Sequence, residues 1–312
     1  MIFMEQKLES MREGMGSVLA ELGYTNKNLV IVGADTTESL SLHQFGEKFP
    51  DRLFNVGIAE QNMIGISAGL ALYGKTVFCG TYAVFLERAI DQIRNTIGYC
   101  KLDVKIIGAH TGISVGPDGG SHQAIEDIAI MRAIPNMKVV VPSDSYSTKA
   151  LVNEMANTKG PFYLRLIRSS VPNLYQDQKI SVGKANVLRE GKDIAIIACG
   201  IMVHEALKAA DRLQKEGILA RVIDCHTIKP LDEDTIMKAA NETNRVITAE
   251  DHNMYGGLGS AVAELLSRKR PTPIGMVAVK DVFGESGKDT EVMSKYGITE
   301  KDIFDKAKEM VR

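Results

Sequence analysis

Short apolar runs alternate with longer segments of helical periodicity over most of this chain. The runs are rich in β-branched residues and end in polar or glycine-containing loops. In the first half they cover residues 29–34, 76–81, 104–109, 138–142 and 162–166. Apolar runs of this length between helical segments are typical of βαβ units, whose parallel sheet is covered by helices on both faces. The pattern therefore predicts an α/β fold.

The same alternation begins again in the second half. Strands are predicted at 193–200, 220–224 and 245–250, and helices at 203–217, at 232–241 and from 256–260 onward. The polar passage 169–179 has few periodic apolar positions and contains Pro172, which favours a domain boundary. We predict two α/β domains, residues 1–175 and 183–312, joined by a linker at 176–182. Each domain is expected to have a mainly parallel sheet.

Glu60 is the only carboxylate in the segment 57–71, which otherwise holds small, apolar and amide residues. A strand-like run at 52–56 precedes it, and the helix that follows is expected to be nearly all buried. Desolvation at the edge of such a helix disfavours a charged carboxyl, and groups of this kind are frequent at functional sites. The alternative is a structural acid that accepts hydrogen bonds from backbone N–H groups at a helix start.

Charge and composition narrow the function classes. A net charge of -2 gives no electrostatic footprint for nucleic acid or an anionic membrane surface. No apolar run reaches the roughly 18 residues that span a bilayer, and no secretory signal precedes the first helix. The cysteines are widely separated, which favours reduced structural thiols in a cytoplasmic protein over a metal site. They are Cys79, Cys100, Cys199 and Cys225.

Six segments occur in an order that resembles one enzyme family. They are GIAEQ at 57–61, GTYAVFLERA at 80–89, HTGISVGPDGGSHQ at 110–123, IPN at 134–136, VPSD at 141–144 and LIR at 166–168. With these motifs the chain resembles the C-terminal half of transketolase, over nearly all of its 312 residues. The resemblance implies a pyrimidine-binding domain followed by a transketolase C-terminal domain.

The resemblance also implies a missing half. Transketolases are about twice as long, and their N-terminal half carries a GDG…N motif that holds a divalent metal (Mg or Ca) and the diphosphate of the cofactor. The similar string GPDGG at 116–120 is followed by no suitably spaced Asn-bearing helix. Because Met1 stands just before the first expected helix, we expect a natural half: the smaller subunit of a split transketolase. Self-association through both domains, as a homodimer within a heterotetramer, is also expected.

By resemblance, five residues contact the cofactor, thiamine diphosphate. Glu60 would hydrogen-bond a pyrimidine nitrogen, and Phe85 would stack on the ring with Tyr82 beside it. Asp35 would lie near the cofactor and Arg88 would contact the pyrimidine. Without the surrounding motifs, an aromatic pair three residues apart on a helix face would indicate core packing instead.

His110, Asp118 and His122 lie in one glycine-rich segment, 110–123. Three polar side chains so close together are unsuited to a core, so we expect this segment to be a loop that lines a cleft. By resemblance, Asp118 orients a sugar hydroxyl and His122 contacts the C1 hydroxyl or carbonyl oxygen of the donor. His110 would lie near the acceptor and its phosphate. Because free imidazole titrates close to neutral pH, it suits such work. Glu60, His122 and His110 are the expected catalytic residues.

The family's phosphate-binding positions correspond to Arg12, Ser39 and Arg168, together with His110. A phosphate dianion calls for guanidinium forks and hydroxyl donors. In the second domain, His204, His226 and His252 are interpreted as structural. The glycine-rich string at 256–259 is only a weak phosphate-loop signal, and by resemblance that region serves packing.

The resemblance implies a thiamine-diphosphate-dependent transferase of the pentose phosphate pathway. It would pass a two-carbon ketol unit from a ketose phosphate to an aldose phosphate. Alternatives within the superfamily are a 1-deoxy-D-xylulose-5-phosphate synthase and the beta subunit of a 2-oxo-acid dehydrogenase. An alternative from another class is an assembly or regulatory half without activity. We expect no activity from the chain without its partner.

Overall fold

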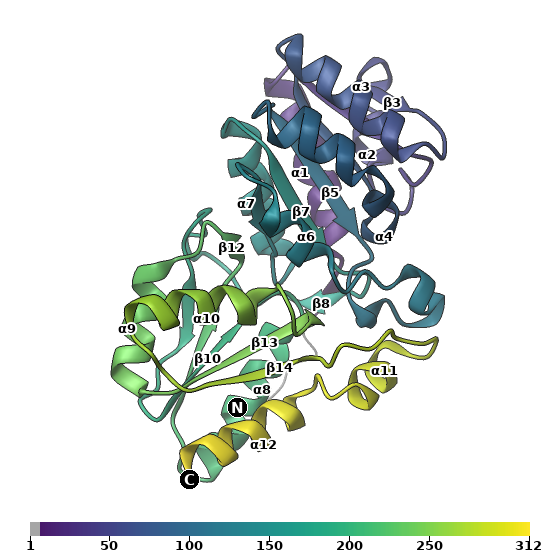
Figure 1. The fold of residues 1–312 in the computed structure, drawn as a ribbon. Helices are drawn as coiled ribbons and strands as arrows, with labels where there is room; N and C mark the ends of the chain where they lie inside the picture. Colours follow the sequence, from purple (N-terminus) through teal and green to yellow (C-terminus); the bar gives the residue numbers. More distant parts are fainter. Residues whose placement is uncertain (1–6) are drawn as a thin grey trace.

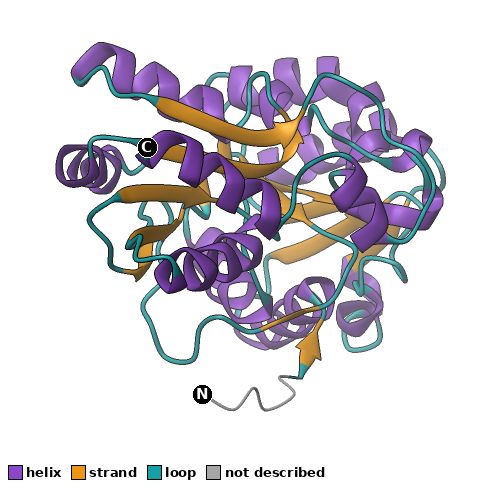
Figure 2. Cartoon of the chain, turned by 90° about the horizontal axis from the view of Figure 1, so that it is seen from below, coloured by secondary structure: helices purple, strands orange, loops and turns teal. Residues whose placement is uncertain are grey.

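The computed structural model describes residues 7–312, so the first six residues of the predicted domain 1–175 lie outside the described part. The chain forms two lobes, one from each half of the sequence (Figure 1). In each lobe the strands lie between helices (Figure 2). The prediction of two α/β units with mainly parallel sheets is confirmed.

The first sheet has the strand order β12-β6-β7-β5-β4-β2-β3 in the described part of the chain. Its strands are β2 (Leu29–Gly33), β3 (Leu53–Asn55), β4 (Thr76–Tyr82), β5 (Val104–Ala109), β6 (Lys138–Val140), β7 (Phe162–Leu166) and β12 (Thr227–Lys229). The neighbours among β2 to β7 are all parallel, and only β12 pairs antiparallel, with β6. The β-branched runs read from the sequence form this sheet.

Helices cover both faces of the first sheet because alternate strand residues point to opposite sides. Leu29 and Ile31 join one apolar cluster with α1 and α7, while Val30 and Val32 join another with α3. The α-helices are α1 (Met11–Thr25), α2 (His43–Gly46), α3 (Glu60–Leu72), α4 (Ala83–Leu86), α5 (Ile90–Gln92), α6 (Asp127–Ala133) and α7 (Ser145–Asn157). Four further elements are 3-10 helices: η1 (Pro50–Arg52), η2 (Glu87–Ala89), η4 (Ile113–Asp118) and η5 (Gly120–His122). The element η3 (Ile93–Gly98) is a π-helix.

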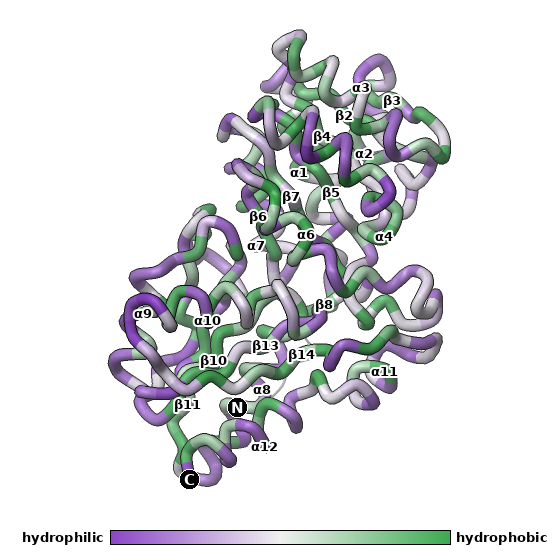
Figure 3. The backbone as a smooth tube through the Cα atoms, in the orientation of Figure 1, coloured by the Kyte–Doolittle hydropathy of each residue, from purple (hydrophilic) through white to green (hydrophobic). Residues whose placement is uncertain are grey.

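The second sheet has the order β14-β13-β10-β11-β9, and only β9 is antiparallel to its neighbour. Its strands are β9 (Asn186–Arg189), β10 (Ile194–Ala198), β11 (Ala220–Asp224), β13 (Val246–Asn253) and β14 (Ile274–Val279). Its helices are α8 (Met202–Lys215), α9 (Glu233–Thr243), α10 (Leu258–Lys269), α11 (Asp289–Lys295) and α12 (Glu300–Val311). Hydrophobic residues gather on the strands, and hydrophilic ones on the outer helices and loops (Figure 3).

Within the first half, a small antiparallel pair links β1 (Leu8–Glu9) to β8 (Val171–Pro172). The two halves themselves are joined by more than the linker. Strand β12 comes from the second half of the sequence but extends the first sheet along β6. At its far end, the Lys229 ammonium donates to the backbone oxygens of Arg132 and Ile134, each at 2.7 Å. The predicted domain bounds 1–175, 176–182 and 183–312 stay a prediction. Strand β12 falls within 183–312 by sequence but pairs with the sheet of the first domain.

One expectation about α3 was wrong. Met63, Ile64 and Ala68 are buried, but Ile66 and Leu72 are exposed in the single chain. The reason is that small and apolar residues occupy the whole circumference of this helix, while the sheet covers only one face. No helix within residues 7–312 has the length and apolar character needed to cross a membrane.

Candidate active site

Most of the predicted site residues lie along one edge of the first sheet. Asp35 follows β2, Tyr82 ends β4, His110 follows β5 and Arg168 follows β7. These strands are parallel, so their carboxyl ends meet at the same edge, where α/β proteins bind their ligands. The fold therefore brings together residues that are far apart in the sequence.

Glu60 is the first residue of α3 and is 2% exposed. Its Oε2 lies 3.5 Å from Nη1 of Arg88, and the Gln61 amide donates to the Arg88 carbonyl at 3.1 Å. The Arg88 side chain is 61% exposed, so the buried carboxylate is paired with a cation open to solvent. Among the described residues its side-chain partner is Arg88, not a backbone N–H of α3, which disfavours the capping alternative.

Aromatic and imidazole rings form a stacked cluster beside this pair. The rings of Tyr82 and Phe85 stack at 5.3 Å with an interplanar angle of 15°. His110 also stacks on Tyr82, at 3.9 Å, and the rings of His122 and Phe85 meet edge to face at 5.4 Å. Phe85 lies in α4, three residues before Arg88, so the cluster and Glu60 adjoin through one short segment.

His110 is 3% exposed and adopts a left-handed backbone, with φ of 54°. Its Nδ1 is buried and has no hydrogen-bond partner among the described residues. Burial, with the positive charges of Arg12 and Arg168 and the neighbouring His122, lowers the pKa of His110 to about 3. The near-neutral titration expected from the sequence is therefore wrong for His110, whose ring stays neutral because its charged form is both desolvated and repelled.

Two arginines approach the cluster from α1 and from the end of β7. Arg12 donates from Nη1 to the Ser39 carbonyl at 2.6 Å and from Nη2 to the Arg168 carbonyl at 2.9 Å. Arg168 donates to the Val115 carbonyl at 3.2 Å, and its Nε lies 4.0 Å from Asp118 Oδ2. Ser39 thus contacts Arg12 through its backbone oxygen, and the contact of its hydroxyl with phosphate stays a prediction.

Asn55 is a site residue that sequence reasoning missed. Its Oδ1 accepts from the backbone N–H of Asp35 at 2.9 Å and of Gly57 at 3.1 Å, and its Nδ2 donates to Asp35 Oδ1 at 3.2 Å. The side chain holds Asp35 against the turn that leads to Glu60. Its position at the end of β3, directly before the GIAEQ motif, was the available signal.

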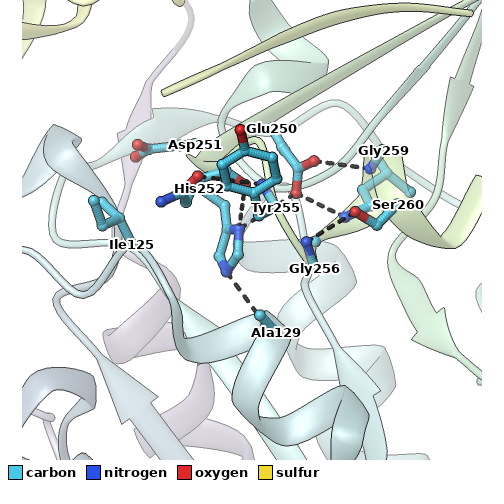
Figure 4. Close-up of polar contacts among 12 residues, drawn as sticks. Ile125, Ala129, Glu250, Asp251, His252, Tyr255, Gly256, Gly259 and Ser260 are labelled. Carbon is cyan, nitrogen blue, oxygen red and sulfur yellow. Dashed lines mark hydrogen bonds and ion pairs between the residues drawn. The ribbon is translucent and has the colours of Figure 1, made fainter. Parts of the chain in front are cut away.

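The three histidines of the second half are buried and hydrogen-bonded. His204 bonds the Ser143 carbonyl at 2.8 Å, and His226 bonds Asn186 Oδ1 at 3.0 Å. Burial lowers the pKa of His204, and that of His226 to about 4. Nδ1 of His252 lies 2.7 Å from the Asn253 carbonyl, while its Nε2 accepts from the backbone N–H of Ala129 at 3.3 Å (Figure 4). These contacts fit the structural role predicted for them.

The glycine-rich string before α10 contacts a carboxylate of the chain itself. The backbone N–H groups of Leu258 and Gly259 donate to Glu250, at 2.7 and 2.8 Å (Figure 4). Glu250 therefore occupies the position that an anion would take at this helix start. Within residues 7–312 no group of three or more His, Cys, Asp or Glu side chains is placed to hold a metal ion.

Comparison with known proteins agrees with this architecture. The family model of the transketolase pyrimidine-binding domain matches residues 9–173, and that of the transketolase C-terminal domain matches residues 183–303. A putative transketolase C-terminal section of Methanocaldococcus jannaschii is 45% identical, over 95% of this chain and 94% of that protein. The 6-deoxy-6-sulfo-D-fructose transketolase subunit SqwH of a Clostridium species is 40% identical, over 98% and 96% of the two chains.

A solved structure gives the same result in three dimensions. It is described as a split gene transketolase, inactive beta4 tetramer, and superposes with a TM-score of 0.90 at 45% identity. The superposition covers 98% of this chain and 99% of that chain, so both sheets and the edge that carries Glu60 are included. The resemblance predicted from the motifs is confirmed, and the chain belongs to the transketolase family.

Proposed function

We propose that this chain is the pyrimidine-binding subunit of a thiamine-diphosphate-dependent transketolase. It would transfer a two-carbon ketol unit from a ketose phosphate to an aldose phosphate, together with a second subunit. The observation that carries the proposal is the buried carboxylate of Glu60 at the start of α3, beside the stacked pair of Tyr82 and Phe85. A lone acid next to a flat aromatic wall is the arrangement that an aminopyrimidine ring requires.

The described residues fit the pyrimidine end of the cofactor. Phe85 and Tyr82 offer a planar apolar surface, and His110 offers a buried Nδ1 without a partner. When bound, thiamine diphosphate supplies the electron sink for the two-carbon unit. Glu60 would share a proton with the ring nitrogen through its carboxyl oxygen, and Arg88, whose Nη1 lies 3.5 Å from Oε2, would orient that carboxyl group.

A partner subunit would complete the site. Asp35, Arg88 and Asp118 are exposed or half-exposed in the single chain, so the site is open to solvent on one side. We propose that the partner carries the GDG…N motif and holds the divalent metal, Mg or Ca, and the diphosphate. Descriptions of two similar proteins as a C-terminal section and as the product of a split gene support a two-subunit enzyme.

The arginine pair would bind the anionic end of the substrate. Arg12 and Arg168 lie within reach of each other, and both raise the local positive potential felt by His110. Their guanidinium groups suit a phosphate. Asp118 and His122 lie in the adjoining loop, where they would bind the sugar hydroxyls and the donor carbonyl oxygen.

The test is the reconstituted complex of this chain with its partner. We expect it to convert a ketose phosphate and an aldose phosphate into the exchanged pair, detected by chromatography. Glu60→Gln should lower the rate by about 10²-fold or more. Glu21→Gln, in an exposed acid of α1, is the matched control and should retain wild-type activity. Full activity of Glu60→Gln would overturn the proposal, as would turnover of pyruvate in place of a ketose phosphate.

A second measurement tests the phosphate site. Arg168→Ala should raise KM for a phosphorylated acceptor about tenfold or more and leave KM for the unphosphorylated sugar unchanged. An equal effect on both acceptors would show that Arg168 does not bind the phosphate.

A further inference from the structure

We propose that Asp251, at the end of β13 in the second half of the chain, is a positioning residue for the substrate loop of the first half. The substrate loop is defined here as residues 112–122, which carry Asp118 and His122. The inference rests on the proposed function for its consequence in catalysis. Its structural premise, that Asp251 holds this loop in place, stands on contacts within the chain.

The side chain of Asp251 reaches from one lobe into the other. It is 2% exposed, and its Oδ1 accepts from the backbone N–H of Ile113 at 2.9 Å, while Oδ2 accepts from that of Ser114 at 3.3 Å. Ile113 and Ser114 are the first two residues of η4. The first N–H groups of a helical turn have no partner within the turn, so the carboxylate of Asp251 fills that role from another lobe.

The backbone of Asp251 is fixed from the first lobe as well. Arg165 of β7 donates to the Asp251 carbonyl at 2.9 Å, and the same guanidinium pairs with Asp127 through Nε at 2.8 Å. The next backbone contact, Asn253 N–H to the Ile125 carbonyl, measures 2.7 Å. Figure 4 shows Asp251 pointing away from Glu250 and toward the side on which Ile125 lies. The carboxylate is thus held on a rigid support.

The substrate loop needs such an anchor because of its composition. Gly112 and Gly116 adopt positive φ of 73° and 74°, conformations that only glycine takes up freely. A Cβ at Gly112 would overlap the Asp251 carboxylate, which shows how closely the two segments approach. The loop also lies against the segment 284–289, where a Cβ at Gly119 would meet the Ser286 side chain. Directly after the loop, the Gln123 amide donates to the Glu285 carbonyl at 3.0 Å. The two bonds to Asp251 therefore fix the start of the loop, and Asp118 follows four residues after the second bonded N–H.

Glu250 provides a matched comparison within the same strand. It is 1% exposed and, like Asp251, accepts two backbone N–H bonds, but these come from α10 of its own lobe. Replacing either carboxylate by its amide leaves one acceptor oxygen and sets an NH2 group against the other backbone N–H, so the two substitutions should destabilise the fold to a similar extent. Only the loss at Asp251 should change how the substrate loop is placed.

The experiment compares Asp251→Asn with Glu250→Gln in the complex of the full chain with its partner. We expect KM for the ketose phosphate to rise about tenfold in Asp251→Asn, with kcat within about twofold of wild type. Glu250→Gln should leave both constants unchanged. If Asp251→Asn does not fold, Asp251→Glu keeps the negative charge and displaces the carboxylate by one methylene, and the same rise in KM is expected.

A second readout does not depend on catalysis. Hydrogen exchange of the backbone amides at 112–118 should become about tenfold faster or more in Asp251→Asn and stay at the wild-type rate in Glu250→Gln. Wild-type KM in a folded Asp251→Asn complex, or equal exchange in the two variants, would overturn the proposal. If the wild-type complex catalyses no ketol transfer, the proposed function fails, and hydrogen exchange alone then decides whether Asp251 anchors the loop.

Discussion

The imidazole of His110 lies 3.9 Å from the ring of Tyr82, at an interplanar angle of 26°. The register of the sheet sets this contact, because Tyr82 of β4 pairs with Ala109 of β5 and His110 is the next residue. The ring thus stacks on Tyr82 and feels the positive charges of Arg12 and Arg168, while its Nδ1 has no hydrogen-bond partner among residues 7–312. A neutral imidazole in this position can donate or accept a hydrogen bond but cannot act as a cation toward a phosphate.

His110 should therefore stay neutral across the physiological pH range. Its pKa is about 3 in the fold, below the ordinary histidine value of 6.5, because burial and the arginines disfavour the imidazolium. Between these two values the unfolded chain binds a proton that the folded chain does not. The free energy of unfolding should therefore fall as the pH drops below about 6.5, by up to about 1.4 kcal/mol per pH unit through this residue.

Urea denaturation of wild type and His110→Gln at several pH values measures this contribution. The variant should lose less stability than wild type between about pH 6.5 and about pH 4.5. Parallel curves for the two proteins would contradict the assignment, as would an NMR titration that places the pKa of His110 near 6.5.

Glu60→Gln should leave the stability of the isolated chain almost unchanged while it removes the activity of the complex. The pair with Arg88 is long and involves a solvent-exposed guanidinium, so it stabilises the fold by less than about 1 kcal/mol. Replacing a buried carboxylate by an amide of the same shape removes a desolvation penalty at the same time. The free energy of unfolding, from chemical denaturation, should thus change by less than about 1 kcal/mol, whereas ketol transfer in the complex is lost. A large destabilisation would show that Glu60 is a structural acid.

The sequence predicted those strands that are contiguous apolar runs, but not β9 or β14 of the second sheet. Residues 104–109 and 162–166 became β5 and β7 without change of bounds. The candidate site residues could be named from the sequence because the six motifs follow one another in an order that is specific to one family. The sequence did not predict β12, since three residues give too little pattern to read, or Asp251, whose partner Ile113 lies 138 positions away. Contacts of this kind depend on how the lobes meet, which no local pattern encodes.

Charge placed on the open face of α3 should weaken self-association. Leu72 is 75% exposed and Ile66 is 37% exposed, and a Cβ on Gly65 or Gly69 would meet nothing within 4 Å. Apolar and small residues on an uncovered helix face suit a packed interface. Leu72→Glu and Ile66→Glu should each shift the chain toward monomer in analytical ultracentrifugation, by roughly tenfold or more in the dissociation constant.

The control for that prediction is another exposed apolar residue away from α3. Leu219 is 40% exposed and lies in the second lobe directly before β11, so Leu219→Glu should leave the association unchanged. An equal effect of all three substitutions would indicate a nonspecific response to charge. No effect of the two α3 variants would place the interface elsewhere.

Asp224 joins three parts of the chain through one carboxyl oxygen. Its Oδ2 accepts from the Ser143 hydroxyl at 2.6 Å and from the Tyr175 hydroxyl at 2.7 Å. Asp224 ends β11 in the second sheet, Ser143 follows β6 in the first, and Tyr175 closes the predicted first domain. All three are buried, and Oδ1 of Asp224 has no hydrogen-bond partner in the described part of the chain.

This junction should become less stable as the pH rises toward neutrality. Burial raises the pKa of Asp224 to about 7, above the ordinary aspartate value of 3.8, so the folded chain keeps a proton that the unfolded chain has lost. The resulting stabilisation is complete below about pH 4 and disappears as the pH passes about 7, at up to about 1.4 kcal/mol per unit.

Asp224→Asn should therefore gain stability relative to wild type by about 2 kcal/mol or more between about pH 5 and about pH 7. Tyr175→Phe, which removes a hydrogen bond but keeps the titrating carboxyl, should retain the wild-type slope. If urea denaturation gives Asp224→Asn the same pH dependence as wild type, Asp224 is ionised throughout, and the junction tolerates a buried charge.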